Sequence, residues 1–168
     1  MTNPISAVPL PKELELIREE LLAAAEIHND DPQGEWPEGV KLAAAFAPQA
    51  IAESLIPKLH AHLVDVPIAY VWREAIKRRD RTILGRAATA GGRLNYFSGM
   101  DFVIDFNWEQ WSDLTTLQRI ALVDHELSHC GPDGMVSHDL EEFRSIVERW
   151  GLWQPDVAAF ANSVRGIA

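Results

Sequence analysis

Residues 115–131 read TTLQRIALVDHELSHCG, and the rest of the chain is best understood by working outward from this stretch. It consists largely of good helix formers, Thr115 can cap its start, and Gly131 followed by Pro132 stops the helix. Four apolar side chains share one side of such a helix: Ile120, Val123, Leu127 and Cys130. The spacing therefore predicts a helix that packs inward along this face and presents polar side chains along another.

The polar face carries the pentapeptide His-Glu-Leu-Ser-His at 125–129. Residues four apart on a helix lie about one turn apart on the same face, so His125 and His129 would point two imidazoles at one place. This arrangement is typical of zinc sites, and Glu126 lies close enough on the helix to reach a water molecule on the metal. The pattern predicts two metal ligands and a general base.

A catalytic zinc ion usually takes three protein ligands, and His138 is the first choice for the third. The segment 130–134 has the turn residues needed to double the chain back toward the helix. Glu141 and Glu142 remain alternatives, although Glu142 stands three residues after Asp139, the spacing of a capping box. A side chain that caps its own helix would not be available to a metal ion.

Other polar residues near the motif have weaker claims. Asp124 or Glu141 could accept a hydrogen bond from a ligand histidine, although we expect Asp124 to lie on a solvated face. Cys130 belongs to the apolar stripe, so we expect a buried structural thiol instead of a metal ligand. Tyr96 could stabilise an oxyanion if its strand borders the cleft, but packing in the core or at a sheet edge is the default.

The remaining histidines and the aromatic residues after position 100 are expected to be structural. Ordinary surface or core positions are predicted for three histidines: His28, His60 and His62. Packing between sheet and helices, and not a binding platform, is predicted for four tryptophans: Trp108, Trp111, Trp150 and Trp153.

Composition indicates a folded chain in a reducing compartment. The sequence has 168 residues, is 47% hydrophobic and contains six tryptophans, which fits one domain with a substantial core. A single cysteine cannot form an intramolecular disulfide, and residues 1–5 have neither a basic leader nor an apolar run. No run approaches the roughly 20 apolar residues needed to span a bilayer. We therefore expect a cytoplasmic protein with no membrane partner.

The net charge of −10 is unevenly distributed. Residues 61–100 hold seven basic and three acidic side chains, whereas the flanking segments are acidic. An acidic protein is repelled by phosphates, so general nucleic-acid binding is not expected. The basic run Lys77–Arg81 is a candidate contact patch, and a solvated turn between strands is the preferred interpretation.

The periodicity along the chain predicts an α+β fold, with a small, mostly antiparallel sheet beside the motif helix. Helical spacing marks segments before and after the sheet: 11–28, 43–63, 139–150 and 155–165. Strand-forming residues, in one case bounded by glycine turns, mark four segments between them: 66–72, 82–84, 93–97 and 101–106. In the last of these, Phe102, Ile104 and Phe106 alternate with less apolar residues, which predicts one buried face.

The sequences ALVDHELSHCG at 121–131 and HDLEEF at 138–143, with upstream segments 70–73 and 101–104, resemble the putative phage metallopeptidase family. The resemblance covers residues 50–153 and implies a zincin-like domain encoded by a phage or prophage. The chain is also distantly similar to SprT-like proteases, in which a later histidine completes the zinc site. This similarity supports His138 as the third ligand. On this basis residues 1–168 form one domain, with a zincin-like core at 50–153 and a helical extension at 1–45.

The sequence favours a zinc-dependent peptidase that hydrolyses peptide bonds through a metal-activated water. Its partner would be a peptide or protein substrate, and its oligomeric state is not determined. A second hypothesis is an interaction protein, with structural zinc or a vestigial motif, that blocks a basic host factor. A third is a peptidase positioned on DNA by Lys77–Arg81. An open fourth coordination position would favour the enzyme, and a closed four-ligand site the structural role.

Overall fold

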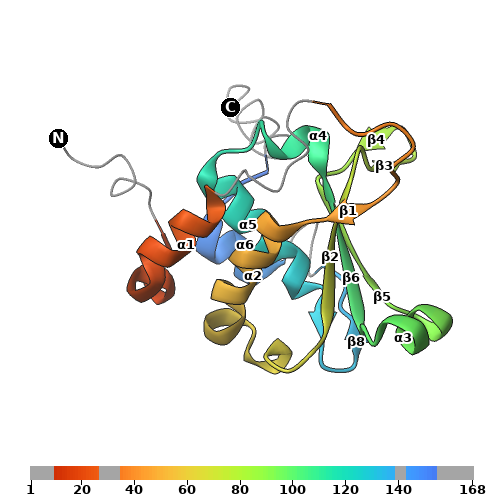
Figure 1. Ribbon diagram of the computed structural model, residues 1–168. Helices are drawn as coiled ribbons and strands as arrows, with labels where there is room; N and C mark the ends of the chain where they lie inside the picture. Colours follow the sequence, from red (N-terminus) through yellow and green to blue (C-terminus); the bar gives the residue numbers. More distant parts are fainter. Residues whose placement is uncertain (1–9, 27–34, 139–142, 155–168) are drawn as a thin grey trace.

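The computed structural model describes residues 10–26, 35–138 and 143–154. A four-stranded sheet with the order β1-β2-β6-β5 lies at one side of the molecule (Figure 1). It consists of β1 (Ala43–Ala44), β2 (Ile68–Arg73), β6 (Phe102–Asn107) and β5 (Gly85–Thr89). The central pair β2–β6 is parallel, and the two outer pairs are antiparallel.

One face of the sheet contributes to the hydrophobic core. Phe102, Ile104 and Phe106 are buried, whereas Val103 and Asp105 between them are only partly covered, as the alternation predicted. Residues 70 and 72 of β2 stand opposite residues 104 and 106 of β6 and are buried with them. The sheet therefore presents a single apolar face, against which the helices pack.

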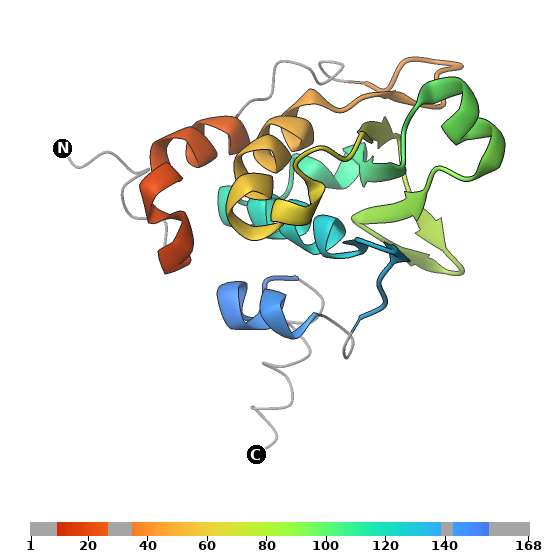
Figure 2. The same cartoon turned by 90° about the horizontal axis from the view of Figure 1, so that it is seen from below.

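The helices α1, α2, α5 and α6 lie on this side of the sheet (Figures 1 and 2). A 3₁₀ helix η2 (Lys12–Ile17) leads into α1 (Arg18–Ala25), which packs on α2 (Phe46–Leu59) and on α5 (Thr116–Ser128). A 3₁₀ turn η3 (Ala61–Leu63) follows α2, and α6 (Arg144–Trp150) packs on α5. The motif helix α5 is thus surrounded by helices on one side and by β5 on the other.

Most predicted elements are present, although the helix predicted from residue 43 begins at Phe46 because residues 43–44 form β1, and three further features differ from expectation. The sheet is mixed, because the six-residue ladder between β2 and β6 is parallel. The strand predicted at 82–84 is displaced: Arg81–Thr82 form β4, which pairs with β3 (Lys77–Arg78) in a separate hairpin, and β5 begins at Gly85. The predicted helix at 155–165, and the helix end expected at 29–34, lie outside the described residues.

The third difference is the strand predicted at 93–97, which is wrong. These residues form helix α3 (Gly92–Ser98), and Gly99 ends it in the left-handed conformation with φ 72°. Asn95 stabilises this end by donating a hydrogen bond to the Met100 carbonyl over 2.8 Å. Flanking glycines, interpreted as turns around a strand, in fact begin and end a helix.

Candidate metal centre

The motif helix α5 forms where its local sequence predicts. Thr115 accepts a hydrogen bond from the backbone N–H of Gln118, whose side chain accepts one from the backbone N–H of Thr115, so a complete capping box starts the helix. The helix ends at Ser128 with His129 as its C-cap. Both motif histidines therefore lie at the C-terminal end of α5, where the chain leaves the helix.

A hairpin of β7 (Cys130–Gly131) and β8 (Gly134–Met135) then turns the chain back, as the turn residues predicted. Its tightness depends on glycine: a Cβ on Gly131 would lie 2.5 Å from a methyl carbon of Val136. The backbone N–H of Val136 donates to the carbonyl of His129 over 2.8 Å, and His138 follows two residues later. The hairpin thus returns His138 to the end of the helix that carries the other two histidines.

The three imidazoles converge through their Nε2 atoms. The Nε2 atom of His138 lies 3.2 Å from that of His125 and 2.9 Å from that of His129. Zinc holds imidazole nitrogens at about 2.0–2.1 Å, so nitrogens around a tetrahedral ion lie about 3.3 Å apart. The observed distances are close to this value, and the ligand atoms of all three residues form one group that could hold a metal ion.

The donor chemistry also suits a metal ion. The Nδ1 atom of His129 lies 2.7 Å from the carbonyl oxygen of Val136, which can only accept a hydrogen bond. Nδ1 therefore carries the proton, and Nε2 keeps its lone pair. Exposure increases across the group: His125 is buried, His129 is partly buried and His138 is exposed. The group is open to solvent on the side of His138.

Two aromatic side chains form a wall against the imidazoles. The ring centroid of Phe143 lies 5.6, 4.8 and 5.1 Å from those of His125, His129 and His138. The ring of Trp153 lies 6.0 Å from that of His125, and both aromatic residues are buried. Sequence analysis predicted no role at the site for either residue. Nothing in their spacing separates a wall of this kind from ordinary core packing.

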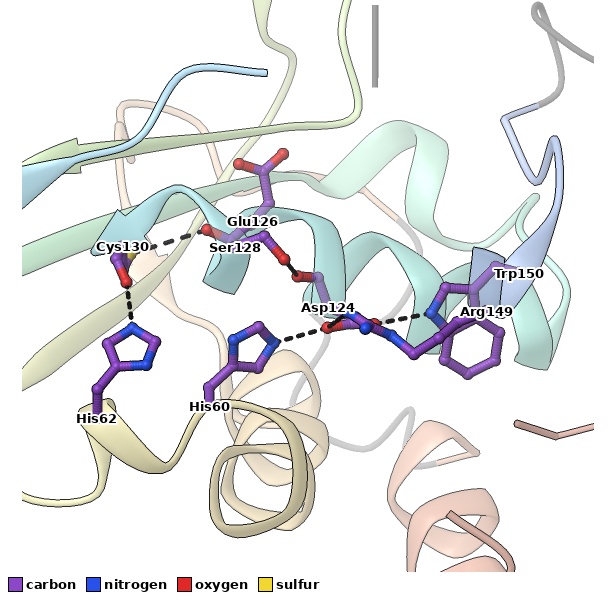
Figure 3. A network of polar contacts seen from close by, with 8 residues as sticks. All are labelled: His60, His62, Asp124, Glu126, Ser128, Cys130, Arg149 and Trp150. Carbon is purple, nitrogen blue, oxygen red and sulfur yellow. Dashed lines mark hydrogen bonds and ion pairs between the residues drawn. The ribbon is translucent and has the colours of Figure 1, made fainter. Parts of the chain in front are cut away.

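Glu126 is buried beside the start of β5. It is 3% exposed, and its Oε1 atom lies so near Gly85 that a Cβ there would be 2.8 Å away. Figure 3 shows its side chain pointing to the opposite side of α5 from His60. The sequence did not identify Gly85, because the partner that requires a glycine lies 41 positions further along the chain.

Asp124 corrects one expectation. A solvated face was preferred for it, but Asp124 is fully buried, and both of its oxygens are bonded. Among the described residues, its side chain bonds His60, Arg149 and Trp150. Burial by itself raises the pKa of Asp124, but the hydrogen bonds from His60 and Arg149 outweigh burial and lower it below the ordinary value.

Four other candidate residues, a cysteine, two histidines and a tyrosine, lie within the described part of the chain. Cys130 is a buried thiol, as expected, and burial followed by the charge of Glu126 raises its pKa to about 12. His60 is buried and His62 bonds the Cys130 carbonyl over 2.7 Å, so both are structural. Tyr96 lies on helix α3, so the strand expected to carry it is absent from 92–98, and its exposed fraction of 82% shows that the predicted core or sheet-edge packing is wrong as well.

The structure describes the basic run and the four tryptophans, whereas four other candidate residues lie outside the described ranges. The run at 77–81 is the exposed β3–β4 hairpin, as the solvated-turn interpretation predicted. Three of the four tryptophans, at 111, 150 and 153, are buried, and the one at 108 is partly buried. His28, Asp139, Glu141 and Glu142 lie outside the described residues. Among the described residues, no helix has both the length and the apolar character needed to cross a bilayer.

The fold and the site together define an α+β protein in which a hairpin and one helix bring three histidines to a candidate metal centre. The chain matches a family model described as "Putative phage metallopeptidase" over residues 40–165. Since this match covers well over half of the sequence, the chain belongs to that family. No curated protein and no solved structure matches the chain.

Proposed function

We propose that this protein is a zinc-dependent metallopeptidase with a zincin-like core, encoded by a phage or prophage and acting in the host cytoplasm. The observation that carries the proposal is the convergence of three imidazole Nε2 atoms, together with the buried Glu126 that follows His125 on α5. Membership of the family supports the reaction type. The buried thiol of the single cysteine agrees with a reducing compartment.

The residues divide the chemistry between them. His125, His129 and His138 would hold the metal ion, and imidazole ligands suit zinc. When bound, zinc lowers the pKa of a water molecule toward about 7 and polarises a carbonyl group. Glu126 accepts the proton of the attacking water and passes it to the departing amine. Burial of Glu126 between α5 and β5 keeps this carboxylate in one place.

The sheet offers a place for an extended substrate. β5 is the last strand in the sheet order, and it lies beside both α5 and the β7–β8 hairpin. A peptide that added itself to the outer edge of β5 would run past the helix that carries the motif. Backbone hydrogen bonds would then supply much of the affinity, and few side-chain pockets would be required.

A three-ligand site favours catalysis over a structural metal. Within the described residues the group has three histidines, of which His138 is exposed. Catalytic zinc sites keep one coordination position open for water, whereas structural sites are closed by four protein ligands. The alternative of a non-catalytic zinc protein that binds a host factor requires a fourth protein ligand or an absent metal.

The proposal is tested by replacing Glu126 with Gln. We expect E126Q to retain one zinc ion per chain, measured by elemental analysis, and to lose cleavage of unfolded casein. Glu38→Gln, an exposed loop position, is the matched control and should cleave at the wild-type rate. Unchanged cleavage by E126Q with full zinc content would remove Glu126 from the mechanism. Wild-type protein without metal would refute the proposal itself.

A further inference from the structure

The residue just before the first motif histidine, Asp124, is a buried carboxylate bonded through both of its oxygens. Asp124 is completely buried, and its Oδ1 atom lies 2.6 Å from Nε2 of His60. Its Oδ2 atom accepts hydrogen bonds from Nε of Arg149 and from the indole N–H of Trp150, each over 2.8 Å. A second donor of Arg149, Nη2, reaches Oδ1 over 3.2 Å. Figure 3 shows these partners gathered around Asp124.

These bonds join three helices at one point. His60 is the C-cap of α2, Asp124 belongs to α5, and Arg149 and Trp150 form the end of α6. A buried carboxylate without its partners would be costly, so the contact strongly favours one placement of α6 against α5. The sequence positions that meet here are 64 and 25 residues apart.

The same α6 carries the aromatic wall of the candidate metal centre. Phe143 is its N-cap and packs on all three imidazoles. Trp153 follows the helix, packs on His125, and accepts a hydrogen bond from the side chain of Gln118 at its carbonyl. The placement of α6 therefore determines whether two aromatic rings cover the buried side of the imidazole group.

We propose that the Asp124–Arg149–Trp150 contact is a positioning device for the metal centre: by holding α6 against α5 it keeps Phe143 and Trp153 on the imidazoles and slows release of the metal. The inference rests on the proposed function, because it requires that the three histidines bind a metal ion. It assigns Asp124 and Arg149 a role in retaining the ion without direct contact with it. Residues that orient metal ligands from outside typically contribute 10–100-fold in affinity.

The test measures transfer of zinc from the full-length protein to a chromophoric chelator. Arg149→Met removes two of the bonds to Asp124, and we expect zinc release about 10-fold faster than from wild type. Arg149→Lys keeps the positive charge but cannot form the two bonds of the guanidinium group to Asp124. Its rate of zinc release should therefore lie between those of Arg149→Met and wild type. Trp150→Phe removes one of the bonds to Asp124, together with the five-membered part of the indole ring, and should give the smallest increase in the rate of zinc release.

A control separates this role from a general loss of stability. Leu21→Ala creates a cavity at a fully buried position of α1, a helix that lies on the opposite side of the molecule from the β7–β8 hairpin (Figures 1 and 2). We expect L21A to lower the urea midpoint of the metal-free protein but to release zinc at the wild-type rate. Equal rates for R149M and wild type, or equally raised rates for R149M and L21A, would overturn the inference. Wild-type protein that binds no zinc would instead refute the proposed function.

Discussion

Replacing Gly85 with alanine would place a methyl group against the side chain proposed as the general base. The new Cβ would lie 2.8 Å from Oε1 of Glu126 and 3.1 Å from its Cδ and Cγ atoms. Ordinary van der Waals contact begins at 3.4 Å, so the carboxylate would have to move by about 0.6 Å. Misplacement by about 1 Å can cost about 100-fold in rate, and we therefore expect kcat to fall about 10-fold in G85A.

Fold stability and metal content should survive this change. Gly85 does not adopt a positive φ, so alanine fits its backbone, and the contacted atoms belong to a side chain that can shift. Alanine also reduces the entropy of the unfolded chain, which stabilises by about 0.4–1 kcal/mol. The loss should thus appear in kcat, with one zinc ion per chain and an unfolding midpoint close to that of wild type.

The assay compares casein cleavage by G85A and by Gly91→Ala. A Cβ on Gly91 would meet no atom within 4 Å, and its φ is −72°, so G91A should behave as wild type. If G85A cleaved as fast as G91A with full zinc content, the position of the Glu126 carboxylate would not limit catalysis. Loss of zinc from G85A would place the effect in the histidine site and refute the reasoning in another way.

Three further predictions concern buried groups that are not proposed to bind the metal ion. Cys130 is 1% exposed with a pKa raised to about 12, so at pH 8 its reaction with a disulfide reagent should be at least about 100-fold slower in the folded than in the urea-unfolded protein. Burial, followed by the charges of Cys130 and Glu53, raises the pKa of Tyr70, so the folded state retains a proton that the unfolded chain releases above about pH 10. The contribution of Tyr70 to the free energy of unfolding is therefore complete below about pH 10 and is lost above it. In urea titrations between pH 9 and 11, Tyr70→Phe should lose less unfolding free energy than wild type. Arg119 is buried and donates to one carbonyl at the end of α1 and two at the end of the short helix α4 (Trp108–Trp111), so Arg119→Met should destabilise by about 2 kcal/mol in the same measurement.

The parts of the molecule that the sequence predicted are those that depend on near neighbours. The capping box of Thr115, the helix to Ser128 and the hairpin that returns His138 each involve residues within about ten positions. Helical periodicity is also local, and it placed His125 and His129 at one end of one helix. The three-histidine group was predictable because its members fall within a 14-residue window.

The sequence predictions that failed concern short segments whose residues fit more than one conformation or pairing. The glycines on either side of 93–97 fit a strand between turns as well as a helix with glycine at both ends, and only the packed structure distinguishes the two. The parallel pairing of β2 with β6 was likewise hidden, because β5 and α3 intervene between them in the chain. Pairing partners are determined by the burial of one sheet face, which no single segment contains.

The sequence alone determined the motif helix, the hairpin behind it and the histidines that these two elements bring together, because short-range hydrogen bonds and helical geometry fix them. The tertiary structure decided how that group is supported. Burial of Asp124 against His60 and Arg149, the aromatic wall of Phe143 and the space that Gly85 leaves for Glu126 all depend on contacts between distant segments. Such contacts exist only once the helices and the sheet have packed, since desolvation and close approach are properties of the assembled core.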